Sequence, residues 1–274
     1  MQGLCYDDTE TPRQVWINSK AMSIEKKIWQ TYETAYEDLP DYAKASIGTW
    51  TANNPDWEHG YMSGPDREKF FKENFDEDVY NTYVNLPLGV MKAGLWRFAI
   101  LYIHGGVYAD MDTHCKAPIS SWLPEDCDAL LDIERDTPWL ATQVIAAKSG
   151  SKILKAAIDL CVERCSSGII EHNHMVHYYT DVQMFTDAMY KELGVDPYQK
   201  HLNEWAPELM DMPFLKDNNV KILHGEEARR LLDRDVVHLY WGDDREEGWI
   251  AWKKDPIVNK SYPNGFNPHE WSEE

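Results

Sequence analysis

The most regular hydrophobic pattern in the chain lies between residues 87 and 104. Apolar residues recur there at the three- and four-residue spacing of one helix face: Met91, Leu95, Phe98, Ala99 and Tyr102. Pro87 suits a first helical position, because the N–H that proline lacks has no partner inside the helix there. Gly105 and Gly106 follow and are typical of a helix end. The pattern predicts one helix that ends at the glycine pair.

A short strand is predicted directly after the two glycines. Residues 107–111 are apolar and β-prone apart from Asp110, and Asp112 follows them. Because side chains alternate along a strand, Asp110 and Asp112 are expected to point to one side. Two such carboxylates form half of an all-oxygen site for Mg²⁺ or Mn²⁺, which the oxygens of a diphosphate complete. Gly105 and Gly106 let a ligand approach the backbone closely.

Helical and strand patterns alternate through the rest of the chain. Helices are predicted at about residues 66–74, 151–165 and 180–193. Strands are predicted at residues 130–133, 142–147, 220–223 and 236–240. This alternation predicts an α/β sheet with ligand sites at strand ends.

The length and charge of the chain limit what it binds. Its 274 residues suit one sizeable core, and no linker rich in Pro, Gly or Ser divides them. We expect a single domain over residues 1–274, with a lead-in at about 1–24 and an acidic tail at about 262–274. The net charge of −20 argues against nucleic acid as a partner. It also repels a diphosphate, so a cation at Asp110 and Asp112, and the charge of Arg97, become important.

The sequence contains no stretch long and apolar enough for a transmembrane helix, and residues 1–14 are too polar for a signal peptide. We therefore expect the chain as given to be soluble. The five cysteines lack CxxC spacing, which argues against zinc. Cys115 and Cys127 are candidates for a disulfide across the loop after the predicted strand. Cys161 and Cys165 lie four apart on a predicted helix, too far for an unstrained disulfide.

Residues 93–112 carry a motif of a known family. The family pattern is approximately Ala-Asp-Leu-x-Arg, an apolar residue, then Leu-Tyr-x-x-Gly-Gly-Val-Tyr-x-Asp-x-Asp. The matching residues here are Ala93, Gly94, Leu95, Trp96, Arg97, Leu101, Tyr102, Gly105, Gly106, Val107, Tyr108, Asp110 and Asp112. The chain resembles the DXD-containing, family 32-like glycosyltransferases that share a sugar-binding region with the fungal initiating α-1,6-mannosyltransferase. A lone DxD is weak evidence, but the arginine and glycine pair at the right offsets make the resemblance specific.

The resemblance continues more faintly along most of the chain. Residues 26–31 are similar to the family's opening strand, whose end helps to form the nucleotide pocket, and residues 54–58 to the lead into its second strand. Residues 142–147 and 180–188 are similar to a later strand and helix. His238 resembles a late histidine that lies near the metal and diphosphate.

The resemblance implies a GT-A-type fold, a Rossmann-like mixed sheet flanked by helices in a single α/β domain. It implies a metal-dependent glycosyltransferase that passes a hexose, mannose as first choice, from a nucleotide diphosphate sugar to a hydroxyl acceptor with retention. The cofactor is then Mn²⁺ or Mg²⁺, the donor GDP-mannose or a UDP-hexose, and the acceptor a hydroxyl of a glycan, lipid or protein. A Golgi or secretory lumen location follows if an N-terminal anchor is missing from this chain, and a cytoplasmic one otherwise.

The resemblance also implies roles for single residues. Asp110 and Asp112 are the catalytic pair, and with His238 they are the expected metal ligands. The expected donor-binding residues come from several segments: Trp29, Gln30, Arg97, Gly105, Gly106, Tyr108 and Trp241.

Other interpretations of these residues remain open from the pattern alone. Arg97 also fits a charge on a helix surface, and His238 a hydrogen-bonded core histidine. Three further histidines, His172, His174 and His177, lack ligand spacing and are expected in an exposed polar loop.

Two positions depart from the family pattern. Gly94 stands where the family has an aspartate that helps to hold donor sugar hydroxyls, and it shares a helix face with Arg97. Asp181 and Val182 stand where Gly-Pro is usual. Gly94 supports an alternative function, a relative that binds nucleotide sugars but is impaired in transfer. A DxD-type phosphatase is a further alternative, which needs a longer apolar strand and Thr or Val in place of His114.

Overall fold

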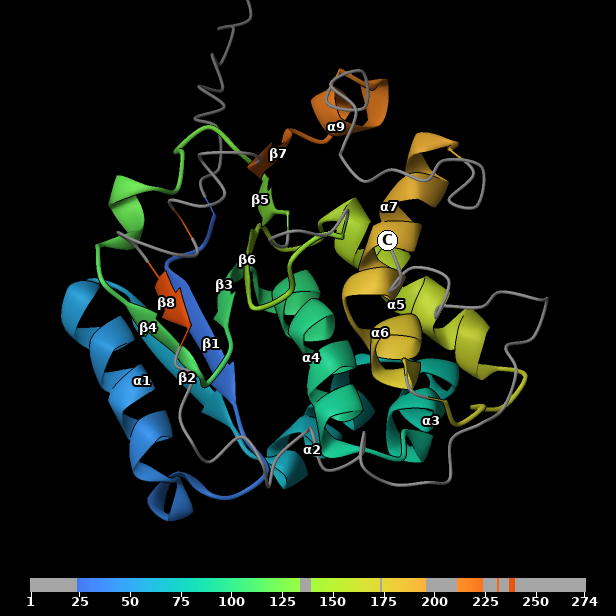
Figure 1. Ribbon diagram of the computed structural model, residues 1–274, viewed down its shortest axis with the longest axis horizontal. Coiled ribbons are helices and arrows are strands. Elements are labelled where there is room, and N and C mark those ends of the chain that lie inside the picture. Colours follow the sequence, from blue (N-terminus) through green and yellow to red (C-terminus); the bar gives the residue numbers. More distant parts are fainter. Residues whose placement is uncertain are drawn as a thin grey trace, which may run out of the picture.

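A six-stranded mixed sheet forms the centre of the computed structural model, which describes residues 24–133, 139–172, 174–195, 211–223, 231 and 237–239. Its strand order is β2-β1-β3-β6-β5-β7 (Figure 1). The strands are β1 Lys27–Thr31, β2 Glu58–Met62, β3 Gly106–Ala109, β5 Ala129–Asp132, β6 Val144–Ala147 and β7 Val220–Leu223. A second, two-stranded sheet pairs β4 Thr113–Cys115 with β8 Val237–Leu239.

Strand direction decides which strand ends lie together. β1 is parallel to both β2 and β3, whereas β6 runs antiparallel to β3 and to β5. The carboxyl ends of β1 and β3 therefore share one edge of the sheet with the amino end of β6. In open α/β sheets, ligands bind at the carboxyl ends of parallel strands.

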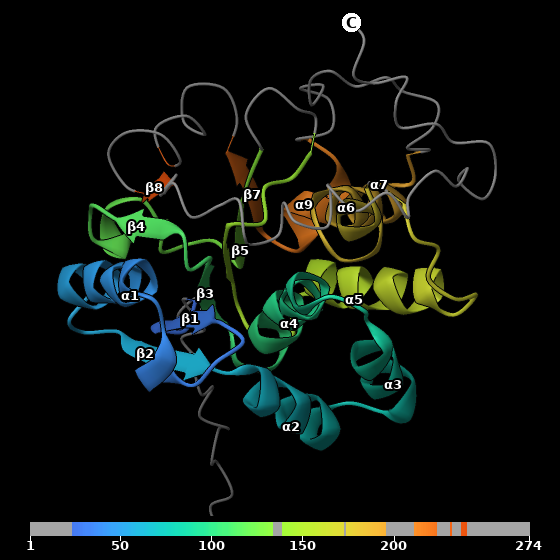
Figure 2. The ribbon, with the colours of Figure 1, turned by 60° about the horizontal axis from the view of Figure 1, so that its bottom comes forward.

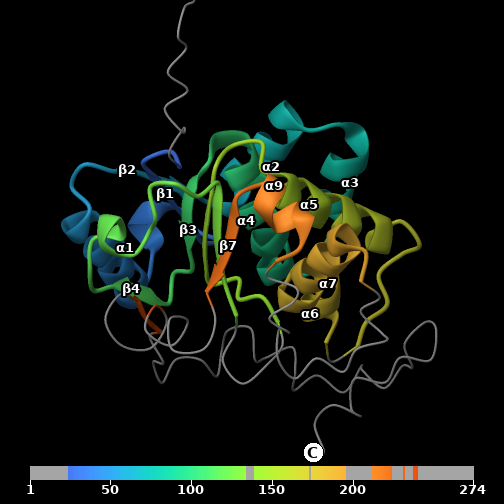
Figure 3. The ribbon, with the colours of Figure 1, turned by 90° about the horizontal axis from the view of Figure 1, so that it is seen from above.

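Helices cover both faces of the large sheet. The described helices are α1 Asp41–Asn53, α2 Gly64–Asn74, α3 Glu77–Asn85, α4 Gly89–His104, α5 Lys152–Cys165, α6 Met175–Thr180, α7 Val182–Leu193 and α9 Pro213–Asp217, with 3-10 turns η1 Tyr36–Asp38 and η2 Ile119–Ser121. Figures 2 and 3 show α1 and β4 on one side of the sheet, and α4, α5 and α7 on the other. Local sequence supports these starts: Ser63 and Asp66 form a capping box on α2, and Asp76 caps α3.

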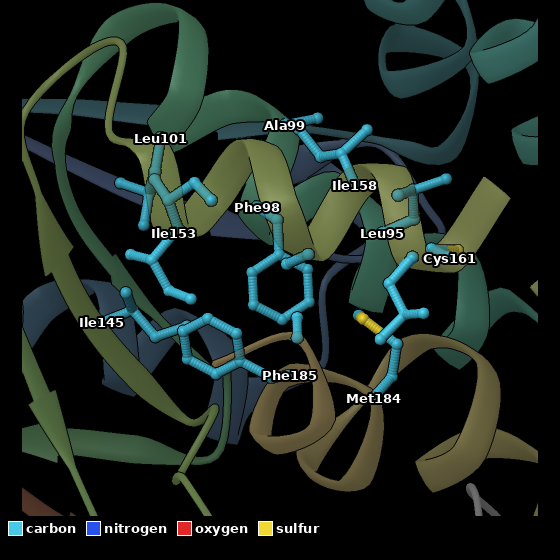
Figure 4. Packing of buried hydrophobic residues seen from close by; sticks show 14 of the residues in the cluster. Leu95, Phe98, Ala99, Leu101, Ile145, Ile153, Ile158, Cys161, Met184 and Phe185 are labelled. Carbon is cyan, nitrogen blue, oxygen red and sulfur yellow. The ribbon is translucent and has the colours of Figure 1, made fainter. Parts of the chain in front are cut away.

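Side-chain alternation along the central strands divides the core into two apolar layers. Val107 and Ala109 of β3 pack with Trp50 of α1, whereas Tyr108 belongs to the layer that contains α4. Figure 4 shows this second layer, in which three helices and β6 meet through Leu95, Phe98, Ala99, Leu101, Ile145, Ile153, Ile158, Cys161, Met184 and Phe185. Burying a side chain of the Leu or Phe type contributes about 1.5–3 kcal/mol. The layer therefore holds α4 firmly against β3.

The predicted elements agree with the structure to within about two residues at most ends, but two differ in a way that matters. β3 ends at Ala109, so the prediction of a strand to residue 111 is wrong. The predicted helix at 180–193 is two helices, α6 and α7, joined at Asp181. The helices α1 and α3 were not predicted, because their short amphipathic patterns are interrupted by polar residues.

Some expectations lie outside the described residues, namely the lead-in at 1–23, the tail at 262–274 and Trp241. Within the described ranges, the helices are all too short or too polar to cross a membrane. The thiols of Cys115, Cys127, Cys161 and Cys165 are free, so the candidate disulfide between Cys115 and Cys127 does not form.

Candidate active site

The two motif aspartates lie in the turn that follows β3. The Asp110 N–H donates to the Gln143 carbonyl oxygen at 2.9 Å, which extends the pairing with β6 by one residue. Thr113 closes the turn, since its N–H and its hydroxyl donate to the Asp110 carbonyl oxygen at 3.1 and 2.6 Å. Asp112 lies inside this turn. The two carboxylates are therefore neighbours because the chain turns here. The predicted cause, alternation of side chains along a strand, is wrong.

Buried polar side chains of β1 and α1 hold this turn in place. Gln30 Nε2 donates to Ser46 Oγ at 2.9 Å and lies 3.4 Å from the Asp110 carbonyl oxygen. Ser46 Oγ donates to the Thr113 carbonyl oxygen at 2.6 Å, and Trp50 Nε1 contacts Thr113 Oγ1 at 3.2 Å. Gln30 was expected to bind the donor, but the structure places it, fully buried, against the backbone of the turn.

Arg97, in the middle of α4, links the turn to β6. Its Nη1 donates to the Thr142 carbonyl oxygen at 2.9 Å, and its Nη2 lies 3.5 Å from Asp110 Oδ1. The guanidinium lies 5.0 Å from the centre of the Tyr108 ring, and the Tyr108 hydroxyl donates to Asp110 Oδ1 at 2.5 Å. Only 6% of the Arg97 side chain is exposed, which excludes the surface-charge interpretation. The structure thus brings Arg97, Tyr108 and Asp110 together.

A third carboxylate, Asp181, lies against the other end of the same guanidinium. Its Oδ1 accepts from Arg97 Nη1 at 3.2 Å and from Thr142 Oγ1 at 2.5 Å. Its Oδ2 lies 3.1 Å from His177 Nδ1. The expectation of an exposed histidine loop is wrong, because His177 is part of α6 and His172 is buried. Sequence reasoning treated Asp181 only as a departure from a family pattern.

Burial and neighbouring charges separate the pKa values of these carboxylates. Burial raises the pKa of Asp110 to about 7, and the nearby Asp112 and Asp181 add to this shift while Arg97 opposes it. Burial also acts to raise the pKa of Asp181, but the hydrogen bond with His177 and the charge of Arg97 outweigh it and hold that pKa at about 2. Asp181 is therefore fully ionised at neutral pH, whereas Asp110 titrates there.

The oxygen ligands of the turn fit a hard divalent cation. Tyr108 and Arg97 both contact Oδ1 of Asp110, and neither contact uses Oδ2. Within the part of the chain that the structure describes, no three His, Cys, Asp or Glu side chains form a group able to hold a metal ion. Mg²⁺ is commonly held by one or two carboxylates together with water and substrate phosphates. Asp110 and Asp112 therefore suit a cation that binds together with a phosphate-containing ligand.

The indole of Trp29 and the two motif glycines lie at the start of β3, although the backbone of Trp29 pairs with Tyr108. Trp29 Nε1 donates to the Gly105 carbonyl oxygen at 2.9 Å. Gly105 and Gly106 have φ values of 63° and 109°, and a Cβ on Gly106 would lie 2.5 Å from the Lys27 carbonyl oxygen. A strand of this length spans about 13 Å. The Trp29 indole and the glycines therefore shape the start of β3, and their expected role in binding the donor stays a prediction.

The β8 strand returns late in the sequence to the segment that follows the aspartates. In its antiparallel pairing with β4, residue His238 is opposite His114. Because β4 begins directly after the turn, this register places the backbone of His238 close to the site. The structure describes β8 by its backbone and not by its side chains, so the expected metal-ligand role of His238 stays a prediction.

Gly94 has no room for a side chain, which yields a first prediction. A Cβ at this position would lie 2.5 Å from the carbonyl oxygen of Thr180, the last residue of α6. We expect Gly94→Asp to destabilise the protein by about 1–3 kcal/mol, because α4 and α6 must separate to admit the side chain. Urea unfolding measures this, with Gly48→Asp as the control, since Gly48 lies in α1 with open space around it. Equal unfolding midpoints for the two variants would contradict the prediction.

The order of strands and the acidic turn after a central strand define the class of fold. A search of solved structures finds similarity to a chain described as PaToxG Glycosyltransferase, with a TM-score of 0.50 and 17% identity over 76% of this chain and 83% of that chain. The fold is therefore similar to that of GT-A glycosyltransferases.

Sequence comparison shows which family part of the chain is similar to. Residues 40–129 match the family model described as glycosyltransferase sugar-binding region containing DXD motif. The putative glycosyltransferase HOC1 of Saccharomyces cerevisiae is 28% identical over 155 residues, 50% of this chain and 39% of that protein. The initiation-specific alpha-1,6-mannosyltransferase of Candida albicans is 29% identical over 102 residues, 36% of this chain and 26% of that protein. The matches span less than half the length of these relatives. The chain is therefore similar to the DXD-containing glycosyltransferases.

Proposed function

We propose that this chain is a metal-dependent glycosyltransferase that moves a hexose from a nucleotide diphosphate sugar to a hydroxyl acceptor. One observation carries the proposal: Asp110 lies at the carboxyl end of a central strand, with Asp112 in the same turn and Arg97 and Tyr108 on its Oδ1. The match of residues 40–129 to the DXD-containing glycosyltransferase family model supports the proposed reaction class. The DxD-type phosphatase finds no support in these comparisons.

The proposed metal ligands are Asp110 and Asp112, with His238 as a third candidate. When bound, Mn²⁺ or Mg²⁺ supplies a Lewis acid that offsets the charge of a diphosphate. The protein's own task is to hold the carboxylates still. Thr113 fixes the backbone of the turn, and Tyr108 fixes Oδ1 of Asp110. Such preorganised groups lose little energy to rearrangement during the reaction.

The proposed transfer breaks the bond between the anomeric carbon of the hexose and the diphosphate oxygen. The acceptor oxygen bonds to that carbon and loses its proton to the departing diphosphate or to water, and the diphosphate leaves with the electron pair of the broken bond. The resemblance implies that configuration is retained. Arg97 keeps a positive charge beside Asp110 throughout, since the surrounding carboxylates and Tyr108 raise its pKa although burial opposes this.

GDP-mannose is the first donor that we propose, because a similar protein is named an alpha-1,6-mannosyltransferase. The UDP-hexoses are the other proposed donors. The acceptor is proposed to be a hydroxyl of a glycan, lipid or protein, and nucleic acid is disfavoured by the net charge of −20. A Golgi or secretory lumen location is part of the same proposal.

The alternative of a relative impaired in transfer rested on Gly94. In the structure, Asp181 places a carboxylate against Arg97 from another element. Loss of an aspartate at position 94 therefore does not remove the carboxylate from this side of the site, which favours the enzyme over the impaired relative.

Release of free nucleotide tests the proposed function. The native chain is mixed with Mn²⁺ and, in turn, GDP-mannose, UDP-galactose, UDP-glucose and UDP-N-acetylglucosamine. Metal-dependent release that favours one donor is expected. Metal-dependent binding without release would support the impaired relative, and neither binding nor release of any donor would overturn the proposal.

The metal site yields a prediction about pH. A cation binds the ionised form of Asp110, whose pKa is raised to about 7, chiefly by burial. The ionised fraction grows about tenfold between pH 6 and pH 8, so we expect the apparent affinity for Mn²⁺ to rise by about that factor. Calorimetric titration with Mn²⁺ at pH 6, 7 and 8 measures it. An affinity that is the same across this range would be inconsistent with the proposed site.

A further inference from the structure

We propose that Asp181 is a specificity-determining residue that binds a hydroxyl of the donor hexose, and that His177 positions it. This inference rests on the proposed function, because it assigns a part of the same donor site. Neither the motif nor the family match, which ends at residue 129, includes Asp181 or His177.

The guanidinium of Arg97 places Asp181 beside the motif. One terminal nitrogen of Arg97 contacts Asp181 Oδ1 at 3.2 Å, and the other lies 3.5 Å from Asp110 Oδ1. Because both nitrogens belong to one small planar group, the two carboxylates must lie on neighbouring positions around it. A ligand held at Asp110 therefore lies within reach of Asp181.

Asp181 is oriented and retains capacity to accept hydrogen bonds. Its carboxylate contacts Arg97, Thr142 and His177, three contacts for a group that has about four lone-pair sites. The side chain is 18% exposed, so part of it remains accessible to a ligand. An ionised carboxylate only accepts hydrogen bonds, so the group that suits this accessible part is a donor such as a sugar hydroxyl.

The packing around Gly94 explains why this carboxylate comes from the junction of α6 and α7. The Thr180 carbonyl oxygen occupies the space that a Cβ on Gly94 would need, and α6 packs directly against α4. The next residue, Asp181, lies between α6 and α7 and places its carboxylate against Arg97. The close packing of α6 against Gly94 therefore also places Asp181 beside Arg97. Figure 1 shows α6 between α4 and α7.

The test compares Asp181→Asn with a matched control on the same helix, Asp187→Asn. Asp187 is also largely buried and paired with an arginine, Arg164, at 2.5 Å. We expect Asp181→Asn to lower kcat/KM for the preferred nucleotide sugar about 10- to 100-fold, which corresponds to a hydrogen bond to a charged group. The affinity for the nucleoside diphosphate alone, measured with Mn²⁺, should stay within about threefold, since that ligand has no sugar. The control should change neither quantity.

Deoxy donors separate hydroxyl recognition from a structural role. The 2-, 3-, 4- and 6-deoxy analogues of the preferred donor are tested on the native protein and on Asp181→Asn. For one of them the two changes should not add, because both remove the same hydrogen bond. His177→Gln, which keeps Asp181, should show a smaller loss of the same kind and serves if Asp181→Asn does not fold.

The outcomes distinguish this inference from the proposed function. If the native chain turns over a donor and the losses from Asp181→Asn add to those of every deoxy analogue, Asp181 does not contact the sugar and the inference is wrong. An equal loss of nucleoside diphosphate binding would likewise overturn it, by showing a structural role. If the native chain neither binds nor consumes any donor, the proposed function falls and this inference falls with it.

Discussion

Asparagine in place of Asp110 or Asp112 is expected to lower donor turnover by about 10³-fold. Asparagine has nearly the same shape as aspartate but lacks its charge, so each variant removes an anionic ligand from the proposed metal site. Asp110→Asn also replaces a charged acceptor for the Tyr108 hydroxyl and leaves Arg97 with one charged neighbour fewer. Initial rates of nucleotide release at saturating Mn²⁺ measure the loss.

An exposed acidic residue provides the control for this loss. Asp126 is exposed and pairs with Lys221 of β7, the edge strand, which is three strands from β3. Asp126→Asn changes the net charge of the protein by the same amount and should leave turnover within about twofold of native. If both motif variants released nucleotide at the native rate and required the same Mn²⁺ concentration, the turn would not be part of the active site.

Removal of the Arg97 side chain is expected to cause the largest loss of stability. Arg97→Met leaves the carboxylates of Asp110 and Asp181 without the cation that lies between them. Breaking a buried ion pair from one side typically costs about 3–5 kcal/mol. Methionine fills much of the volume, so the loss reports charge and hydrogen bonds more than packing. Urea unfolding of the metal-free protein at pH 7.5 measures it.

A surface ion pair separates this effect from a general dependence on charge. Lys26 pairs with Asp56, and their side chains are 63% and 62% exposed. Lys26→Met removes the same charge and should leave the unfolding midpoint close to native, because exposed pairs add little stability. If Arg97→Met unfolded at the same urea concentration as Lys26→Met, the charge arrangement around Arg97 would not stabilise the fold. If the charge arrangement is correct, the double variant Arg97→Met/Asp181→Asn should recover part of the stability that Arg97→Met loses.

Short-range patterns were sufficient for much of the fold. The spacing of apolar residues in 87–104 and the glycine pair after them predicted α4 and the start of β3, since both depend on neighbours in sequence. The predicted alternation of helices and strands led to the correct class of mixed sheet. The ends of β3 and of α6 were not predictable in this way. A turn closed by Thr113 and a helix break at Asp181 depend on hydrogen bonds that only the folded chain makes.

The candidate site residues likewise divide into those that the sequence predicted and those that it did not. The motif spacing pointed to Arg97, Tyr108 and Asp110, and they are in contact because α4 and β3 are consecutive elements that pack together. Trp29 and the motif glycines were assigned to the donor by resemblance, but they lie at the start of β3. The buried Ser46 and Trp50, one turn apart on α1, were missed because polar residues interrupt the apolar pattern of that helix.

The sequence by itself determined the resemblance to a family, the class of fold and the pair of acidic residues, because each depends on residues close together along the chain. Only the tertiary structure decided that Thr180 closes the space beside Gly94 and that Asp181 lies against Arg97. Residues 94 and 181 are distant in sequence, and their relation arises from the packing of α6 on α4, which no local pattern contains. Long-range packing thus determined the charge around Arg97, and with it the proposed recognition of the sugar.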